Sequence, residues 1–236
     1  MKLYYLDHSG FMLETDRRNY VFDYYRDPAG IVKKAAQAGK ELWFFVTHVH
    51  HDHYVPEILD FNTPTTRYIV HEDVPHSQMP ADRTTVMAVG DEAQVEDIPV
   101  KMYGSTDAGG SFWLKIGDAR IFHAGDLNWW HWLGDTDENN REAKGFMDTE
   151  FARAAGMDAD VILFPIDDRL EAAQEWGIVE FLHVVKMPKL LVAMHLNGPA
   201  WKPSVHFKAL YETLPTWVPT KNGEDLELST YGVAEK

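Results

Sequence analysis

Continuous apolar segments constrain the fold of this chain more than any other feature. Residues Leu42–Val46 are all apolar and do not alternate with polar residues, which is typical of a strand buried on both faces. Val161–Phe164 and Leu190–Met194 repeat this pattern later in the chain. Because such strands need cover on both sides, we expect an α/β fold in which helices cover sheet layers.

The segments around these strands follow a pattern that occurs twice. In the first half, Phe11–Glu14 and Tyr20–Asp23 flank a polar turn and predict a hairpin, and a helix around Ile31–Ala36 ends at Gly39. The second half predicts a hairpin of 112–116 with 121–123 and helices around 147–155, 178–185 and 207–214. No linker or low-complexity segment interrupts the 236 residues, so we expect a single domain over residues 1–236.

Charge and cysteine content exclude several classes of function. The chain has 22 Lys and Arg against 37 Asp and Glu, a net charge of −15, which argues against nucleic acid or an anionic membrane as a partner. It contains no cysteine, which excludes disulfides, thiolate metal sites and a cysteine nucleophile and suits the reducing cytoplasm. No apolar run approaches the ~20 residues of a membrane span. We expect a cytoplasmic protein that acts on a small molecule.

The chemically most informative segment is Thr47–His53, directly after the first buried strand. On an extended backbone, His48 and His50 share one face and can reach one metal ion together. Asp52 and His53 follow where the chain turns towards a helix that Pro56 opens, so this second pair can face a neighbouring position. Imidazoles and carboxylates are the ligands that zinc and similar divalent ions accept. The alternative is a solvated polar loop, which this spacing does not favour.

With this segment the chain resembles the metallo-β-lactamase superfamily of metallo-hydrolases, whose signature His-x-His-x-Asp-His follows a buried strand. Further similar motifs are His123-Ala124-Gly125-Asp126, a late histidine that ends a strand, His195, and the N-terminal Leu6–Phe11. The whole is loosely similar to the ascorbate-6-phosphate lactonase-like branch. The resemblance implies a four-layer αββα sandwich with two metal positions at one edge of its sheets. The metal ligands that it implies are His48, His50, Asp52, His53, Asp126 and His195.

Each of the more isolated residues also has a structural interpretation. Asp126 could be a turn residue or a helix cap, and His195 could be a core histidine, although their order in the motifs favours metal ligands. His8 is either a buried structural histidine or a substrate contact.

The sequence departs from the family pattern at one ligand. Ser105 stands where most family members carry a third zinc-site histidine, and a hydroxyl is a poorer zinc ligand than imidazole. Asp107 could supply an oxygen ligand, a histidine from elsewhere (His131, or else His71 or His76) could replace the missing one, or the site could bind loosely. We expect zinc, with one ion firmly bound and a second held more weakly; manganese and iron remain alternatives.

Other segments near the expected metals have two interpretations each. The run Trp129–Trp132 is either a hydrophobic plug or a wall of the substrate cleft, with His131 and Asn128 offering hydrogen bonds. The pair Asp167 and Asp168 ends a buried strand, where it could serve function or cap a helix, and Asn197 is expected to line the cleft.

These features predict a metal-dependent hydrolase. A bound metal lowers the pKa of water from 15.7 towards ~7, so a metal-bound hydroxide would attack a small ester, lactone or phosphoester. Asp52 is the residue expected to orient this nucleophile or accept its proton. The alternatives are a non-catalytic or lapsed metal-binding module or sensor on the same fold, and redox chemistry at a di-iron site.

Overall fold

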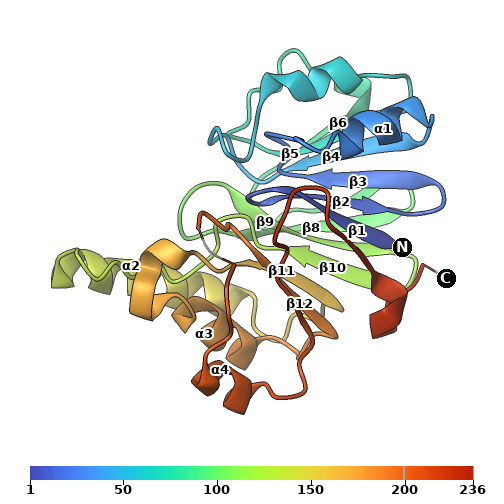
Figure 1. The fold of residues 1–236 in the computed structure, drawn as a ribbon. Coiled ribbons are helices and arrows are strands. Elements are labelled where there is room, and N and C mark those ends of the chain that lie inside the picture. Colours follow the sequence, from blue (N-terminus) through green and yellow to red (C-terminus); the bar gives the residue numbers. More distant parts are fainter. Residues whose placement is uncertain (199, 236) are drawn as a thin grey trace.

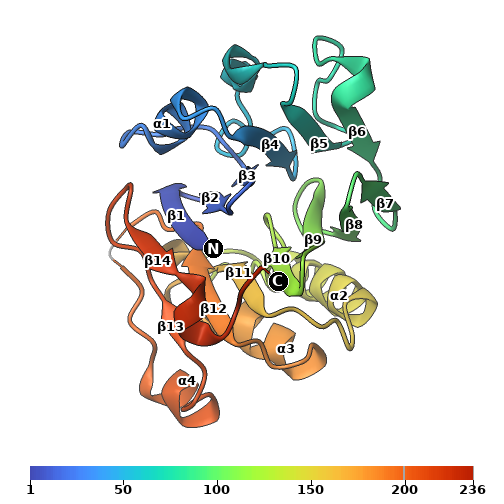
Figure 2. The same cartoon turned by 90° about the vertical axis from the view of Figure 1, so that its right-hand side faces the viewer.

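The computed structural model describes residues 1–198 and 200–235. Two seven-stranded sheets pack face to face, and helices cover the outer face of each (Figure 1). Seen from the side, the layers follow one another as helix, sheet, sheet and helix (Figure 2). The predicted α/β, four-layer αββα sandwich is therefore confirmed.

The first sheet has the strand order β14-β1-β2-β3-β4-β5-β6. Strands β3 to β6 run parallel, whereas β14, β1, β2 and β3 pair antiparallel. The predicted hairpin is formed by β2 and β3, and the predicted buried strand is β4. The bounds are β1 Lys2–Asp7, β2 Gly10–Glu14, β3 Arg18–Phe22, β4 Glu41–Val46, β5 Arg67–His71, β6 Thr84–Met87 and β14 Asp225–Glu227.

The second sheet has the order β13-β12-β11-β10-β9-β8-β7. Strands β7 to β10 pair antiparallel, and β10 to β13 run parallel. The second predicted hairpin is formed by β9 and β10, and the two later apolar runs form β11 and β12. The bounds are β7 Glu92–Val95, β8 Ile98–Gly104, β9 Gly110–Ile116, β10 Ala119–His123, β11 Val161–Pro165, β12 Leu190–Met194 and β13 Thr216–Trp217.

Helix α1 lies on the first sheet, and α2, α3 and α4 lie on the second (Figure 1). The α-helices are α1 Ile31–Gln37, α2 Asp137–Arg153, α3 Trp176–Val184 and α4 Val205–Leu210. The 3-10 turns span Pro56–Phe61, Ala81–Arg83, Asp168–Ala173 and Leu228–Tyr231. Among the described residues, no helix is both long and apolar enough to cross a membrane.

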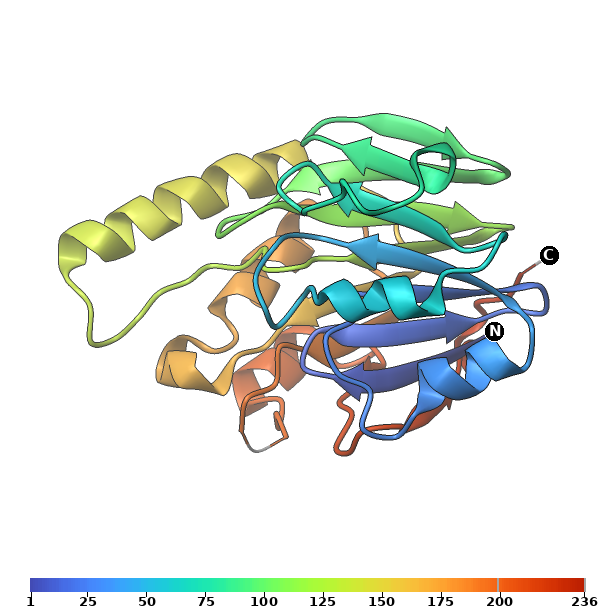
Figure 3. The ribbon, with the colours of Figure 1, turned by 90° about the horizontal axis from the view of Figure 1, so that it is seen from above.

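Two helices differ in length from the sequence prediction. The last one ends at Leu210, because Tyr211 leaves the helical conformation. Helix α2 begins at Asp137, well before the predicted Met147, because the Thr136 side chain accepts a hydrogen bond from the Asn139 N–H and so caps it. Its first half buries no residue and therefore shows no apolar periodicity. This half projects beyond the sheets (Figure 3).

Aromatic side chains fill the space between the sheets. Phe45 of β4 stacks on Phe22 at 5.2 Å and meets Phe112 of β9 edge-on at 5.3 Å, which joins the two sheets. On the far side of the second sheet, Phe122 stacks on Phe181 of α3 at 5.5 Å. Burial of each such side chain contributes about 1.5–3 kcal/mol, so this core fixes the sheets against each other.

The topology brings the ends of many strands to one edge of the sandwich. In the first sheet β1, β3 and β4 point the same way, and in the second sheet β8, β10, β11 and β12 do so. The loops that follow all these strands therefore meet at a common edge, which is where open α/β sheets place their ligands.

Candidate metal centre

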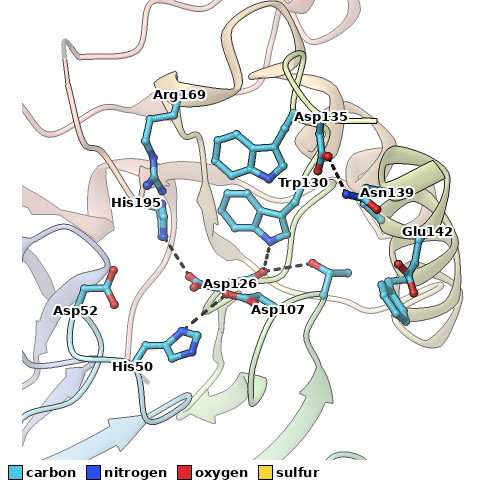
Figure 4. A pocket seen from close by; sticks show the side chains of 14 residues that line it. His50, Asp52, Asp107, Asp126, Trp130, Asp135, Asn139, Glu142, Arg169 and His195 are labelled. Carbon is cyan, nitrogen blue, oxygen red and sulfur yellow. Dashed lines mark hydrogen bonds and ion pairs between the residues drawn. The ribbon is translucent and has the colours of Figure 1, made fainter. Parts of the chain in front are cut away.

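Asp126, which follows β10, lies at the centre of a cluster of histidines (Figure 4). Its carboxylate oxygens lie 3.5 Å from His48 Nε2, 3.1 Å from His53 Nε2 and 3.4 Å from His195 Nε2. All four side chains are buried. Within the described residues, His48 Nε2, His53 Nε2 and Asp126 Oδ1 are buried and form no aligned hydrogen bond, although His53 Nε2 and Asp126 Oδ1 are close enough for an ion pair. Unpartnered buried polar atoms that face one point are what a metal site requires, since leaving them unsatisfied costs about 1–3 kcal/mol each.

A second layer of side chains orients each of these imidazoles through its Nδ1 atom. His53 Nδ1 lies 2.7 Å from Asp23 Oδ2, and His195 Nδ1 lies 2.9 Å from Asp167 Oδ2. The Thr47 hydroxyl donates to Asp23 Oδ2 at 2.7 Å, so its oxygen is free to accept from His48 Nδ1 at 3.0 Å. In the neutral form of these imidazoles, with the single hydrogen on Nδ1, the Nε2 lone pairs would face the centre, as metal-binding histidines require.

The charges of the cluster stabilise each other. Burial alone would raise the pKa of Asp126, but the imidazoles of His53, His48 and His195 outweigh it and hold this pKa well below its usual range. Burial opposes charge on His53 as well, yet Asp126 and Asp23 raise its pKa well above the ordinary value. Asp23 is fully buried, and its pKa is nevertheless lowered because His53 and His123 face it. The carboxylates of the cluster are therefore ionised and able to bind a cation.

Three sets of side chains bring their ligand atoms within 4.8 Å of one another, a spacing that one metal ion can bridge. They are His48 with His53 and Asp126; His50 with Asp107 and Asp126; and His8 with Asp52, His53 and His195. Mixed imidazole and carboxylate donors suit zinc, manganese and iron, so the residues present fit a divalent ion. All six residues that the resemblance implied as ligands belong to these sets.

Asp107 forms one of these sets with His50 and Asp126. Its Oδ2 is 3.7 Å from His50 Nδ1 across the mouth of the site (Figure 4). The loop between β8 and β9 can come this close because residue 109 is glycine. Its φ is +64°, and a Cβ atom at this position would lie 2.1 Å from the Thr47 carbonyl oxygen, which leaves no room for a side chain. The Ser105 hydroxyl accepts a hydrogen bond from the Asp107 N–H at 3.4 Å instead of facing the cluster.

The histidines considered as replacements lie elsewhere. His131 packs against Trp176 with ring centres 4.7 Å apart, outside the three sets. His71 pairs with Asp73 at 3.0 Å, and His76 Nδ1 lies 2.8 Å from the Val74 carbonyl oxygen. Among the alternatives left open by the sequence, the geometry favours the Asp107 oxygen.

Asp126 and His195 of this cluster, with His50, Asp52 and Asp107, line a cavity of about 420 Å³ that is open to solvent. The aromatic run divides between the two predicted roles. Trp130 and Trp132 stack at 6.1 Å and line the cavity, and Trp130 Nε1 donates to the Asp126 carbonyl oxygen at 2.9 Å. Trp129 packs on Trp176 at 5.2 Å, away from the cluster.

Opposite the ligands, the cavity is bounded by the start of α2 and its preceding loop, with Asp135, Asn139 and Glu142 (Figure 4). Arg169 is the basic side chain among the lining residues. Asn128 and Asn197 do not line the cavity: Asn128 Oδ1 accepts from the Trp129 N–H, and Asn197 Nδ2 lies 3.3 Å from Asp167 Oδ2.

The orienting residues Asp23 and Thr47 were not identified from the sequence, and Asp167 was left between two roles. A signal was present, since Asp23 directly follows β3, the strand beside β4, and Asp167 follows β11, the strand beside β12. Polar residues that follow neighbouring parallel strands meet at one edge. This signal can be used only when the order of the strands in each sheet is known.

No protein-family profile and no curated protein sequence matches the chain. Solved structures do match it. Igni18, a metallo-hydrolase from Ignicoccus hospitalis, is 18% identical with a TM-score of 0.63, over 95% of this chain and 97% of its own. YhfI from Bacillus subtilis, a metallo-β-lactamase fold protein, is 12% identical with a TM-score of 0.57, over 96% and 99%.

A third similar structure is CmlA from Streptomyces venezuelae, a diiron β-hydroxylase. It is 12% identical with a TM-score of 0.57, over 96% of this chain and 54% of its own. At such identities the likeness concerns the fold, and the sheet order and layers described above agree with it. The chain has the metallo-β-lactamase fold.

Proposed function

We propose that this protein is a metal-dependent hydrolase of the metallo-β-lactamase superfamily that acts on a small ester, lactone or phosphoester. The observation that carries the proposal is the group of buried, unpartnered imidazole and carboxylate atoms around Asp126, together with the cavity open to solvent that Asp126, His195, His50 and Asp52 line. A structural metal site would be closed by its ligands, whereas a catalytic site keeps access for water and substrate.

Asp126 belongs to two of the three sets, with His48 and His53 and with His50 and Asp107, and it also lies 3.4 Å from His195. The arrangement that the resemblance implies would use His48 and His50, here with Asp107, for the first ion. Asp52, His53 and His195 would hold the second, with Asp126 between the two. When bound, a divalent ion such as zinc lowers the pKa of water and polarises the carbonyl or phosphoryl oxygen of the substrate. Because the first position relies on the exposed pair His50 and Asp107, we expect it to be the weaker one.

Asp52 is the proposed proton acceptor. Its side chain is about one-third exposed and lines the cavity beside the ligands. Burial raises the pKa of Asp52, but the neighbouring His53 outweighs this and the pKa is lowered, so the carboxylate is ionised at neutral pH. An ionised carboxylate at the cavity wall can orient an attacking water molecule and accept its proton.

The cavity suits a small substrate with an anionic or carbonyl group. Its volume of about 420 Å³ accommodates a metabolite rather than a polymer. Arg169 is held by hydrogen bonds from Nε and Nη2 to Asp167, and its guanidinium lies 5.6 Å from the Trp132 ring, so this cation has a fixed place at the wall. The net charge of −15 disfavours nucleic acid as substrate.

A second candidate function is a metal-binding module without hydrolysis. The observation that favours it is Ser105 in the place of a third imidazole, which leaves the first position with a carboxylate. A site that had lost catalysis would have no need for an ionised Asp52 on an open cavity, which is why hydrolysis remains the main proposal.

The test is a panel of chromogenic esters, lactones and phosphodiesters with the metal-free protein and with added Zn²⁺, Mn²⁺ or Fe²⁺. We expect one substrate class to be turned over in a metal-dependent manner, and Asp52→Asn to reduce kcat. Asp160→Asn is the matched control, because Asp160 is a buried carboxylate at the start of β11, away from the cavity. Tight metal binding with no turnover of any class would favour the module.

A further inference from the structure

His8 occupies a strained place beside the metal centre. It lies in the turn between β1 and β2 with φ +53°, in the left-handed region that residues other than glycine seldom adopt. Its backbone is held from both sides: its N–H donates to Tyr5 Oη at 2.8 Å, and its carbonyl oxygen accepts from the His195 N–H at 3.0 Å. His195 itself has φ +59°. Backbone strain of this kind is found mainly at functional sites.

The His8 ring faces the second metal position. Its Nε2 lies 3.5 Å from Asp52 Oδ2, and its ring centre lies 4.0 Å from that of His195 and 5.8 Å from that of His53. Only 4% of His8 is exposed, and among the described residues its Nε2 has no hydrogen-bond partner. Asp52, at 3.5 Å, is close but does not satisfy this nitrogen.

A purely structural histidine in the same region behaves differently. His123 is also fully buried near the centre, but its Nε2 donates to the Ser9 carbonyl oxygen at 2.9 Å and its Nδ1 accepts from the Gly125 N–H at 3.2 Å. Both of its nitrogens are satisfied by the backbone. The Nε2 of His8 is not satisfied in this way, and Asp52, His53 and His195, which form one set of possible ligands with His8, are metal-ligand candidates.

We propose that His8 Nε2 is an additional ligand of the second metal position, together with Asp52, His53 and His195. This set offers three imidazoles and one carboxylate whose ligand atoms lie within 4.8 Å of one another. The inference rests on the metal centre of the proposed function but not on hydrolysis.

The extra imidazole would change which ion the position prefers. His8, Asp52, His53 and His195 would already supply the four ligands that zinc usually takes. An ion that also takes water or substrate would need more than four ligands, which manganese and iron would accept more readily than zinc. His8 would therefore favour manganese or iron at the second position.

The experiment titrates the metal-free full chain with Co²⁺, Mn²⁺ and Zn²⁺ in the absence of any substrate. The variant His8→Asn removes the ligand but tolerates the left-handed backbone, and His8→Gly also removes the strain. We expect each to weaken binding of the more tightly held Mn²⁺ or Co²⁺ ion at least about tenfold. We also expect the visible Co²⁺ absorption to intensify as the coordination number falls, and free imidazole to restore the spectrum of His8→Gly.

The matched control is His71→Asn, which removes a buried histidine that pairs with Asp73 away from the cluster. It should bind all three metals like the unchanged chain. If the His8 variants keep wild-type affinity and an unchanged Co²⁺ spectrum and differ only in the unfolding temperature of the metal-free protein, His8 is structural and the proposal is wrong. Because no substrate is used, absent hydrolysis in the panel above would not affect this result.

Discussion

Asp23→Asn tests whether the buried second layer of side chains creates the metal site. Asp23 is fully buried and accepts three hydrogen bonds: from the Thr47 N–H at 2.8 Å, from the Thr47 hydroxyl at 2.7 Å and from His53 Nδ1 at 2.7 Å. Asparagine has the same shape but only one acceptor oxygen. If that oxygen stays on the Thr47 N–H, the amide NH₂ group faces His53 Nδ1.

An NH₂ group at this place forces the His53 hydrogen onto Nε2, the atom that faces Asp126 at 3.1 Å. His53 then has no lone pair to offer a metal. Loss of such an orienting partner lowers metal affinity about 10–100-fold, which is about 1.4–2.8 kcal/mol at 1.4 kcal/mol per factor of ten. We therefore expect Asp23→Asn to weaken the tightly held ion by this factor, measured by competition with a coloured chelator.

The control is Asp160→Asn, another buried carboxylate, which bonds the Arg120 side chain at 2.9 Å and 3.0 Å at the opposite end of β11. It should lower the free energy of unfolding and leave metal affinity unchanged. The reasoning would be refuted if Asp23→Asn bound metal as tightly as the unchanged chain, or if Asp160→Asn lost as much affinity.

Three further predictions concern the ligands and the charges. Asp126→Asn should abolish metal-dependent turnover in the substrate panel while the far-UV circular dichroism spectrum stays unchanged, because this carboxylate faces His48, His53 and His195; turnover above a few per cent would contradict its role. Asp107→Asn should reduce the bound metal after dialysis by up to one ion per chain without affecting the tighter ion, as elemental analysis can measure. Burial raises the pKa of Asp160, but the hydrogen bonds from Arg120 and Lys189 outweigh it and lower the pKa to about 2. Because the pKa of Asp160 is lower in the folded than in the unfolded state, the ionised carboxylate stabilises the fold at pH values above the unfolded-state pKa. As pH falls from about 4 to 2 this contribution is lost, which after allowance for solvent screening should lower the free energy of unfolding by about 1–2 kcal/mol. Urea unfolding of Asp160→Asn should show a flatter pH profile in that window.

The contiguous part of the site could be predicted from residue spacing alone. The spacing of His48 and His50 predicted that their side chains lie close together, and their ring centres are 4.6 Å apart although the chain bends after β4 instead of continuing extended. Asp126 and His195 lie far along the chain, and spacing does not connect them with His48. Their assignment came from the resemblance of motifs, and the structure places Asp126 beside His53 and His195 beside Asp126.

The residues that the sequence did not assign depend on neighbours and loop conformations. Asp23 acts through His53 because β3 pairs with β4, a fact of sheet order that periodicity does not reveal. Asp107 reaches His50 because Gly109 lets its loop approach the Thr47 carbonyl group closely. The first turns of α2 border the cavity but contain no buried apolar residue, so the sequence has no hydrophobic pattern there that would predict a helix.

The origin of the ligands explains why the core between the sheets matters for chemistry. His48 and His53 follow strands of the first sheet, whereas Asp126 and His195 follow strands of the second, and no single sheet holds a complete set. The rings of Phe22 and His123 stack at 5.2 Å between the sheets, directly below this edge, and His123 leads through two residues to Asp126. Packing at native density transmits small displacements, so the aromatic core sets the distances among the ligands as well as the stability of the fold. A metal site divided in this way assembles only when both halves of the sandwich have packed together.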